Sequence, residues 1–203
     1  MEISPYQIDP KERYKLLIGS VVPRPIALVS TISSSGERNL APFSFFTVAA
    51  YNPMLIAFFP LRFKHESNLK DTVMNIRETA EFVVNITTED MAVAVNTTSG
   101  KFAHGVDEFK ESGLTPVPSK LIKPFRVKES PIHFECRLHK LITLGEEEGG
   151  VDAIFGEVIH VHVDDSLLEN GRIDVRKLKP IARLAGSEWS KLGEIISLER
   201  PIV

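Results

Sequence analysis

Two long segments in the C-terminal half of the chain constrain its fold most strongly. Within residues 132–139 every second side chain is apolar: Ile132, Phe134, Cys136 and Leu138. A period of two with one apolar face predicts a half-exposed β-strand. Residues 153–163 form a second such segment, and the glycine- and glutamate-rich stretch 145–150 between the two predicts a hairpin loop. The chain is therefore expected to be built on antiparallel strands.

Further strands are expected in the N-terminal half. Apolar or β-branched runs bounded by turn residues predict four of them, at 26–32, 43–51, 54–59 and 81–87. The polar stretch 33–39 predicts a turn after the first of these. Because the loops between strands are mostly short, an antiparallel barrel is favoured over a parallel α/β sheet.

Three helices are expected between the strands. Residues 68–78 are expected to form a helix with Asn68 as the N-cap. Its apolar stripe continues just past the end of this range: Leu69, Val73, Ile76 and Ala80. A second helix is expected from Thr87 or Thr88 to about Val95, and a short third one from Asp107 to Gly113. The fold is therefore mainly β with inserted helices.

Length and composition indicate one domain spanning residues 1–203. Domains typically hold about 50–250 residues, and 43% of the 203 residues are hydrophobic. A formal net charge of −3 gives no basic footprint for nucleic acid. The longest apolar runs, such as 54–60, fall far short of the roughly 20 residues of a membrane helix. One cysteine and no signal-like N-terminus lead us to expect a cytoplasmic protein.

Several common catalytic signatures are missing from the sequence. It contains no GxGxxG after a strand, no GxxxxGK[ST], no HExxH and no GxSxG. A dinucleotide-binding Rossmann site and a serine hydrolase are therefore disfavoured.

Residues 39–46, with the sequence Asn-Leu-Ala-Pro-Phe-Ser-Phe-Phe, could line a site for a planar ligand. Pro42 lacks a backbone donor and cannot pair in a central ladder, which would leave neighbouring amides and carbonyls for a ligand. Phe43 and Phe45 offer flat apolar surface, and Ser44 adds a hydroxyl. The alternative is an edge strand that carries core phenylalanines.

Residues 62–72 could bind an anion. Cations and hydrogen-bonding side chains gather before and within the first turn of the expected helix: Lys64, Ser67, Asn68, Lys70 and Thr72. Free amides and the positive end of the helix dipole favour a phosphate at such a place. A capped surface helix with solvated lysines is the alternative.

Other polar residues are weaker candidates for ligands. Ser30 and Thr31 point to opposite faces of their strand, so only one of them can face a given pocket. His160, His162 and Asp164 share one strand face, but no second ligand cluster accompanies them, and we expect no metal site. Cys136 alternates with apolar residues and is expected to be a buried hydrophobe.

The order of these segments resembles the flavin reductase-like family with the FMN-binding split barrel, which includes flavoredoxin-like proteins. The resemblance rests on several stretches in order: 23–31, 39–46, 70–76, 81–85, 107–109, 134–136, 183–186, 192–193 and 200–201. It implies a six-stranded antiparallel Greek-key split β-barrel, a homodimer and FMN near the dimer interface. The chain departs from the family at Ala185 and Trp189, where glycine and tyrosine are frequent, and in residues 62–67.

The resemblance also implies roles for individual residues. The strand 39–46 would lie along the isoalloxazine and ribityl chain, residues 64–72 would hold the phosphate, and Ser30 and Thr31 would line the flavin. The candidate cofactor-binding residues are Ser30, Thr31, Asn39, Ala41, Pro42, Phe43, Ser44, Phe45, Lys64, Ser67, Asn68, Lys70 and Thr72.

The implied activity is reduction of flavin by NAD(P)H, with electrons passed to free flavin, ferric iron or a partner protein. No catalytic side chain is expected, because the two cofactors supply the chemistry and the protein binds and orients them. The alternative is an FMN-carrying electron-transfer or flavin-binding protein without NAD(P)H activity. A heme or pyridoxal phosphate binder on a similar barrel is a weaker third interpretation.

Overall fold

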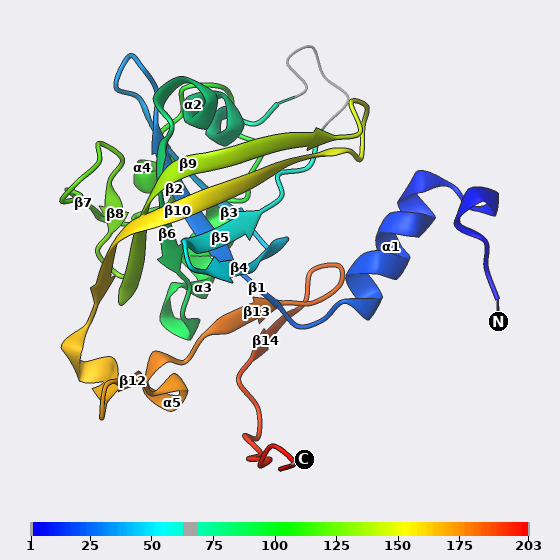
Figure 1. The fold of residues 1–203 in the computed structure, drawn as a ribbon. Coiled ribbons are helices and arrows are strands. Elements are labelled where there is room, and N and C mark those ends of the chain that lie inside the picture. The colour runs from blue at the N-terminus through cyan, green and yellow to red at the C-terminus, as the bar shows by residue number, and fades with distance from the viewer. Residues whose placement is uncertain (1, 63–68, 203) are drawn as a thin grey trace.

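A computed structural model describes residues 2–62 and 69–202 of the chain. Its centre is one antiparallel sheet of seven strands in the order β3-β2-β6-β9-β10-β5-β4 (Figure 1). The strand bounds are Ala27–Ile32 for β2, Arg38–Phe43 for β3, Phe46–Tyr51 for β4, Met54–Phe58 for β5, Glu81–Ile86 for β6, Ile132–Leu144 for β9 and Val151–Val163 for β10. The antiparallel, mainly β class with inserted helices is confirmed.

A two-residue link requires this sheet to curl into a barrel. Strands β3 and β4 occupy the two opposite edges of the sheet, yet only Ser44 and Phe45 separate them in the chain. Consecutive Cα atoms are about 3.8 Å apart, so the two edges must meet at this point. The carbonyl of Phe45 also accepts the amide of Phe59, just beyond β5, at 2.9 Å.

The strand prediction for residues 43–51 is wrong in one respect. The chain bends at Ser44 and Phe45, which divides the expected strand, and residues 38–43 form the separate strand β3. The bend thus gives seven strands instead of the expected six, and the antiparallel barrel itself is as predicted. The turn before β3 is shorter than expected, because the amide of Ser33 donates to the carbonyl of Glu37 at 2.9 Å and closes it there.

The long hairpin of β9 and β10 is confirmed, with residues 145–150 as its loop. The expected half-exposed polar face of β9 is wrong at its start. His133 is 6% exposed and Glu135 is fully buried, because residues 118–127 lie over this face. Further along β9, Arg137 and His139 are exposed as the alternation predicts.

Two apolar clusters lie on the two faces of the sheet. The inner one fills the barrel and includes Val29, Phe58 and Phe82. The outer one lies beneath short helices and includes Leu28 and Phe109. Adjacent residues of β2 thus face different clusters, as the alternation of a strand requires.

Helices cover the sheet or extend from it. Their bounds are Pro10–Ser20 for α1, Asp71–Thr79 for α2, Ala92–Thr97 for α3, Glu108–Ser112 for α4 and Val175–Leu178 for α5, with 3₁₀ turns at Pro5–Gln7, Glu89–Met91 and Asp165–Leu167. Helix α2 begins at Asp71, later than the sequence predicted. Its N-cap is Lys70 and not Asn68, which lies outside the described residues. The limits of α4 are confirmed, since Asp107 caps it and Gly113 ends it at φ 73°.

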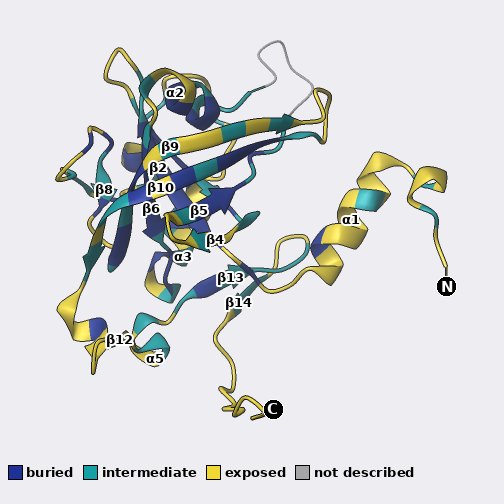
Figure 2. Ribbon diagram, in the orientation of Figure 1, coloured by how far each residue is buried: buried dark blue, intermediate teal, exposed yellow. Residues whose placement is uncertain are grey.

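The remaining short strands form small sheets beside the barrel. They are Arg24–Pro25 (β1) with Ile181–Arg183 (β13) and Trp189–Lys191 (β14), Pro116–Val117 (β7) with Arg126–Val127 (β8), and Leu168–Glu169 (β11) with Arg172–Ile173 (β12). Helix α1 stands away from the barrel and is almost entirely exposed (Figures 1 and 2). In the part of the chain that the structure describes, no helix is long and apolar enough to cross a bilayer.

Candidate functional site

The backbone nitrogen of Pro42 points away from the neighbouring strand β2. The missing N–H of this proline therefore removes no hydrogen bond between β2 and β3. The amide of Leu40 points away from β2 and donates to Oε2 of Glu108 at 2.9 Å. Backbone amides alternate sides along a strand, so position 42 faces the same outer edge as position 40. The Leu40 amide is therefore already bound by α4, whereas the sequence suggested that amides near Pro42 are open to a ligand.

A buried polar network joins β2, β3 and the first turns of α2. The side-chain amide of Asn39 donates to Oγ1 of Thr31 at 3.0 Å and to Oγ1 of Thr72 at 2.9 Å. The amide of Asn75 donates to the same Thr31 hydroxyl at 3.0 Å. All four residues are at most 6% exposed. Three residues chosen from separate segments of the sequence thus meet at one place.

Lys70 links the expected anion-binding segment to the expected aromatic strand. It directly precedes α2, and its Nζ lies 5.4 Å from the centroid of the Phe43 ring. Burial lowers the pKa of the Lys70 ammonium, and the carboxylates of Glu108 and Asp71 act against that shift. This region therefore combines a cation, a helix N-terminus and hydrogen-bonding side chains.

Three residues that the sequence did not single out belong to the same neighbourhood. Asn75 completes the network. Because it lies three residues after Thr72 and so on the same face of the helix, the sequence pattern could have predicted it as a neighbour of Thr72. Nδ1 of His104 lies 3.0 Å from Oδ1 of Asp71, and this hydrogen bond raises the pKa of the imidazole. Burial raises the pKa of Glu108.

The aromatic residues of the segment do not all lie on an open face. Phe43 is 5% exposed and packs on Phe58 with ring centroids 5.0 Å apart, and Ala41 is also buried. Phe45 and Ser44 are half-buried at the bend, and Pro42 is half-buried in β3. Phe43 therefore packs as the alternative of an edge strand with a core phenylalanine describes, and its role beside a ligand stays a prediction.

Ser30 lies apart from the other candidate residues. Its hydroxyl is fully buried and donates to the carbonyl of Phe125, on the face of β2 opposite Thr31. Lys64, Ser67 and Asn68 lie outside the described residues. The structure therefore gathers Thr31, Asn39, Lys70 and Thr72, and places Ser30 in the outer layer.

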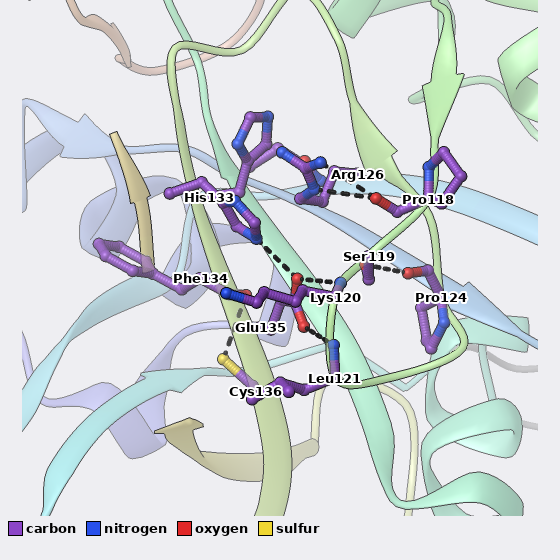
Figure 3. Close-up of polar contacts among 12 residues, drawn as sticks. Pro118, Ser119, Lys120, Leu121, Pro124, Arg126, His133, Phe134, Glu135 and Cys136 are labelled. Atoms are coloured by element: carbon purple, nitrogen blue, oxygen red, sulfur yellow. Dashed lines mark hydrogen bonds and ion pairs between the residues drawn. The ribbon is translucent and has the colours of Figure 1, made fainter. Parts of the chain in front are cut away.

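The polar face of β9 forms a second buried polar group, shown in Figure 3. The carboxylate of Glu135 accepts the amides of Lys120 at 2.7 Å and Leu121 at 2.8 Å, and its Oε1 lies 2.7 Å from Nε2 of His162. Nε2 of His133 lies 2.8 Å from the carbonyl of Val127. These contacts hold residues 118–127 against the sheet.

The histidines considered as metal ligands take part in other interactions. The rings of His160 and His162 meet edge to face at 4.6 Å, and Asp164 accepts the amide of Ser166. Among residues 2–62 and 69–202 no group of three or more histidine, cysteine or acidic residues is placed to hold a metal ion. Cys136 is buried in the barrel, and burial raises the pKa of its thiol.

Two surface hollows lie away from the candidate site. One, of about 400 Å³, is lined by residues such as Glu89, Arg176 and Leu192, and the other, of about 500 Å³, by residues such as Asp90, Ser112 and Lys177. Neither is lined by a candidate cofactor residue.

A family model and two solved structures each match most of the chain. A sequence model of the flavin reductase like domain matches residues 18–179. The chain is similar in structure to nitrilotriacetate monooxygenase component B from Bacillus cereus, with 40% identity, a TM-score of 0.93 and 98% of each chain covered. It is also similar to the 2-nitrobenzoate 2-nitroreductase NbaA of Pseudomonas fluorescens, with 30% identity, a TM-score of 0.89 and coverage of 99% of this chain and 96% of that one.

A third comparison concerns the fold alone. A split-barrel protein of Shewanella frigidimarina, grouped with the flavin reductases, shares 21% identity and a TM-score of 0.84 over 99% of this chain and 100% of that chain.

Proposed function

The chain belongs to the flavin reductase-like domain family, and on that basis we propose that it binds FMN and oxidises NAD(P)H. The observation that carries the proposal is the hydrogen-bonded group of Thr31, Asn39 and Thr72 at the start of α2, where Lys70 is the N-cap residue. A phosphate dianion suits an ammonium group beside a helix N-terminus. The donor set therefore fits FMN.

The chain's own residues would bind and orient the cofactor. Lys70 and Thr72, together with Lys64, Ser67 and Asn68, are proposed for the phosphate. Asn39 and residues 41–45 are proposed for the ribityl chain and the ring, with Thr31 behind them. Ser30, which lies on the opposite face of β2, would support that strand from the outer layer. The chemistry that FMN supplies when bound is acceptance of a hydride from NAD(P)H and release of two electrons to an acceptor.

The electron acceptor is proposed to be free flavin, ferric iron or a partner protein. One similar structure is a component of a monooxygenase, which supports a partner oxygenase, and the other is a nitroreductase. The single cysteine and the absence of a long apolar run support action in the cytoplasm.

Anaerobic mixing with NADH or NADPH tests the proposed activity. The flavin absorption band at about 450 nm should bleach. A chelator should leave the bleaching unchanged, because the flavin and the nicotinamide carry out the hydride transfer without a metal. If neither nucleotide bleaches the band at millimolar concentration while dithionite does, the chain is an FMN-carrying electron-transfer protein. A Soret band near about 400 nm in the purified protein would instead indicate heme.

Replacing Lys70 with alanine should weaken FMN binding more than riboflavin binding. Only FMN carries the dianion that the ammonium and the end of α2 would attract. We expect a loss on the order of 1–3 kcal/mol for FMN, as for other charge-assisted hydrogen bonds. Parallel titrations of FMN, FAD and riboflavin measure it, and wild-type protein should prefer FMN to FAD. Equal weakening of FMN and riboflavin would place Lys70 away from the phosphate.

A homodimer is the proposed assembly. Helix α1 and its flanks expose large apolar side chains, and a broad exposed apolar surface usually marks an interface: Tyr6, Tyr14, Leu16, Leu17, Val21 and Val22. Light scattering at micromolar concentration should give about twice the mass of one chain. A stable, FMN-loaded monomer would contradict this expectation.

A further inference from the structure

Asp152 is contacted by two arginines from different parts of the chain. Arg62 approaches it with two nitrogens, Nε on Oδ2 and Nη2 on Oδ1, both at 3.0 Å. Nη2 of Arg77 lies 3.0 Å from Oδ1, and the Thr143 hydroxyl donates to the same oxygen at 2.8 Å. Asp152 itself is 1% exposed. One buried carboxylate thus connects the chain beyond β5, helix α2 and strand β9.

The backbone reinforces one side of this connection. The amide of Arg62 donates to the carbonyl of Gly150 at 2.8 Å, and the amide of Asp152 donates to the carbonyl of Pro60 at 3.1 Å. Residues 60–62 are therefore held along the start of β10. On the other side, Arg77 belongs to α2, whose first residue is Asp71.

The charges favour an ionised Asp152. Burial alone would raise the pKa of this carboxyl, but the hydrogen bonds from Arg62 and Thr143 and the charge of Arg77 together keep it below its usual value. The two-nitrogen contact of Arg62 also fixes the orientation of the Asp152 carboxylate, because a planar guanidinium matches the plane of a carboxylate. Asp152 is thus a rigid anchor between the hairpin of β9 and β10 and the helix.

We infer that Asp152 is a positioning residue for phosphate recognition: it sets where α2 lies and thereby where Lys70 and Thr72 meet the FMN phosphate. This inference rests on the proposed function. Arg77 and Thr72 belong to the same short helix, so we expect that loosening Arg77 shifts the first turn of α2 as well. Charge-assisted hydrogen bonds depend steeply on distance and angle, whereas contacts with the flavin ring are less directional.

The test is the ratio of FMN to riboflavin affinity in Asp152→Asn. The variant should bind FMN at least tenfold more weakly and riboflavin within twofold of wild type. Arg77→Gln, which changes a side chain that is 41% exposed, should shift the ratio in the same direction by a smaller factor. Glu135→Gln is the matched control, because it alters an equally buried carboxylate that holds residues 118–127. It should leave the ratio unchanged.

A double variant shows whether Asp152 acts through the proposed phosphate ligand. In a Lys70→Ala background, Asp152→Asn should change the ratio by a clearly smaller factor than in the wild-type background, because one of the two contacts that it positions is already gone. An unchanged ratio in Asp152→Asn and Arg77→Gln, or equal loss of both ligands, overturns the inference. If wild-type protein does not distinguish FMN from riboflavin, the proposed phosphate site itself fails. If Asp152→Asn does not fold, Arg77→Gln decides alone.

Discussion

Gly156→Ala is expected to lower the free energy of unfolding by about 3 kcal/mol, the upper end of the usual cost of overpacking a core. A Cβ at this position would overlap Cζ of Phe82 and lie 3.1 Å from two further ring atoms. Phe82 is fully buried and packs edge-on against Phe58 at 5.5 Å. Because Phe82 is fully buried, any shift of its ring disturbs the packing around it, and otherwise β10 itself must move. Urea unfolding followed by circular dichroism measures the loss.

Two companion variants identify the cause of this loss. Gly193→Ala introduces the same methyl group where no atom lies within 4 Å, and it should change stability by less than about 0.5 kcal/mol. Phe82→Leu shortens the clashing side chain, so the double variant with Gly156→Ala should lose less than the sum of the two single losses. Simple additivity would show that the Phe82 contact is not the reason.

Between pH 7 and pH 5 the protein should lose about 2 kcal/mol of stability through His133 alone. Burial lowers the pKa of this imidazole from 6.5 to about 4, and its hydrogen bond to Val127 does not compensate. Its buried Nδ1 has no hydrogen-bond partner among the described residues, so a second proton there would be unsatisfied. His133 takes up a proton near pH 6.5 in the unfolded chain, but only at about pH 4 in the folded chain. Stability therefore falls as the pH falls through that window.

His133→Gln provides the measurement of this effect. Glutamine can still donate to the Val127 carbonyl but does not titrate, so the variant should lose distinctly less stability between pH 7 and pH 5. The window stays above the range in which Glu135 and Asp152 take up protons, since the pKa of each is lowered. Equal pH dependence in the variant and the wild type would assign the acid sensitivity to other groups.

The elements with a clear local period were predictable from sequence, and those shaped by distant neighbours were not. The hairpin of β9 and β10 and the helix α4 follow from alternation and caps within a few residues. The burial of His133 and Glu135 depends on residues 118–127, whose contact with β9 has no local signal. The bend at Ser44 arises because the sheet edges meet there, which is a property of the whole barrel.

The candidate site was predictable in its parts but not in its connections. Thr31, Asn39 and Thr72 were chosen from separate segments, and the structure joins them by hydrogen bonds. The contact of Glu108 could not be predicted from sequence, because its partner, the amide of Leu40, lies 68 positions away in the chain. The alternation along a strand predicts that Ser30 and Thr31 lie on opposite faces, but it does not predict which of the two faces binds a ligand. The assignment of these residues to FMN stays a prediction.

The two-residue link between β3 and β4 also bears on how the chain reaches its native state. The pairs β2–β3, β4–β5 and β9–β10 are local hairpins, whereas β2 pairs Ala27 with Ile86 and β5 pairs Phe58 with Ile154. Local hairpins form within about 1–10 μs, and distant pairings must first overcome the entropy of closing long loops. The contact order is therefore high, which is typical of folding in milliseconds to seconds. Because the link keeps both sheet edges together from the outset, we expect the pairing of β6, β9 and β10 between them to be the slow step.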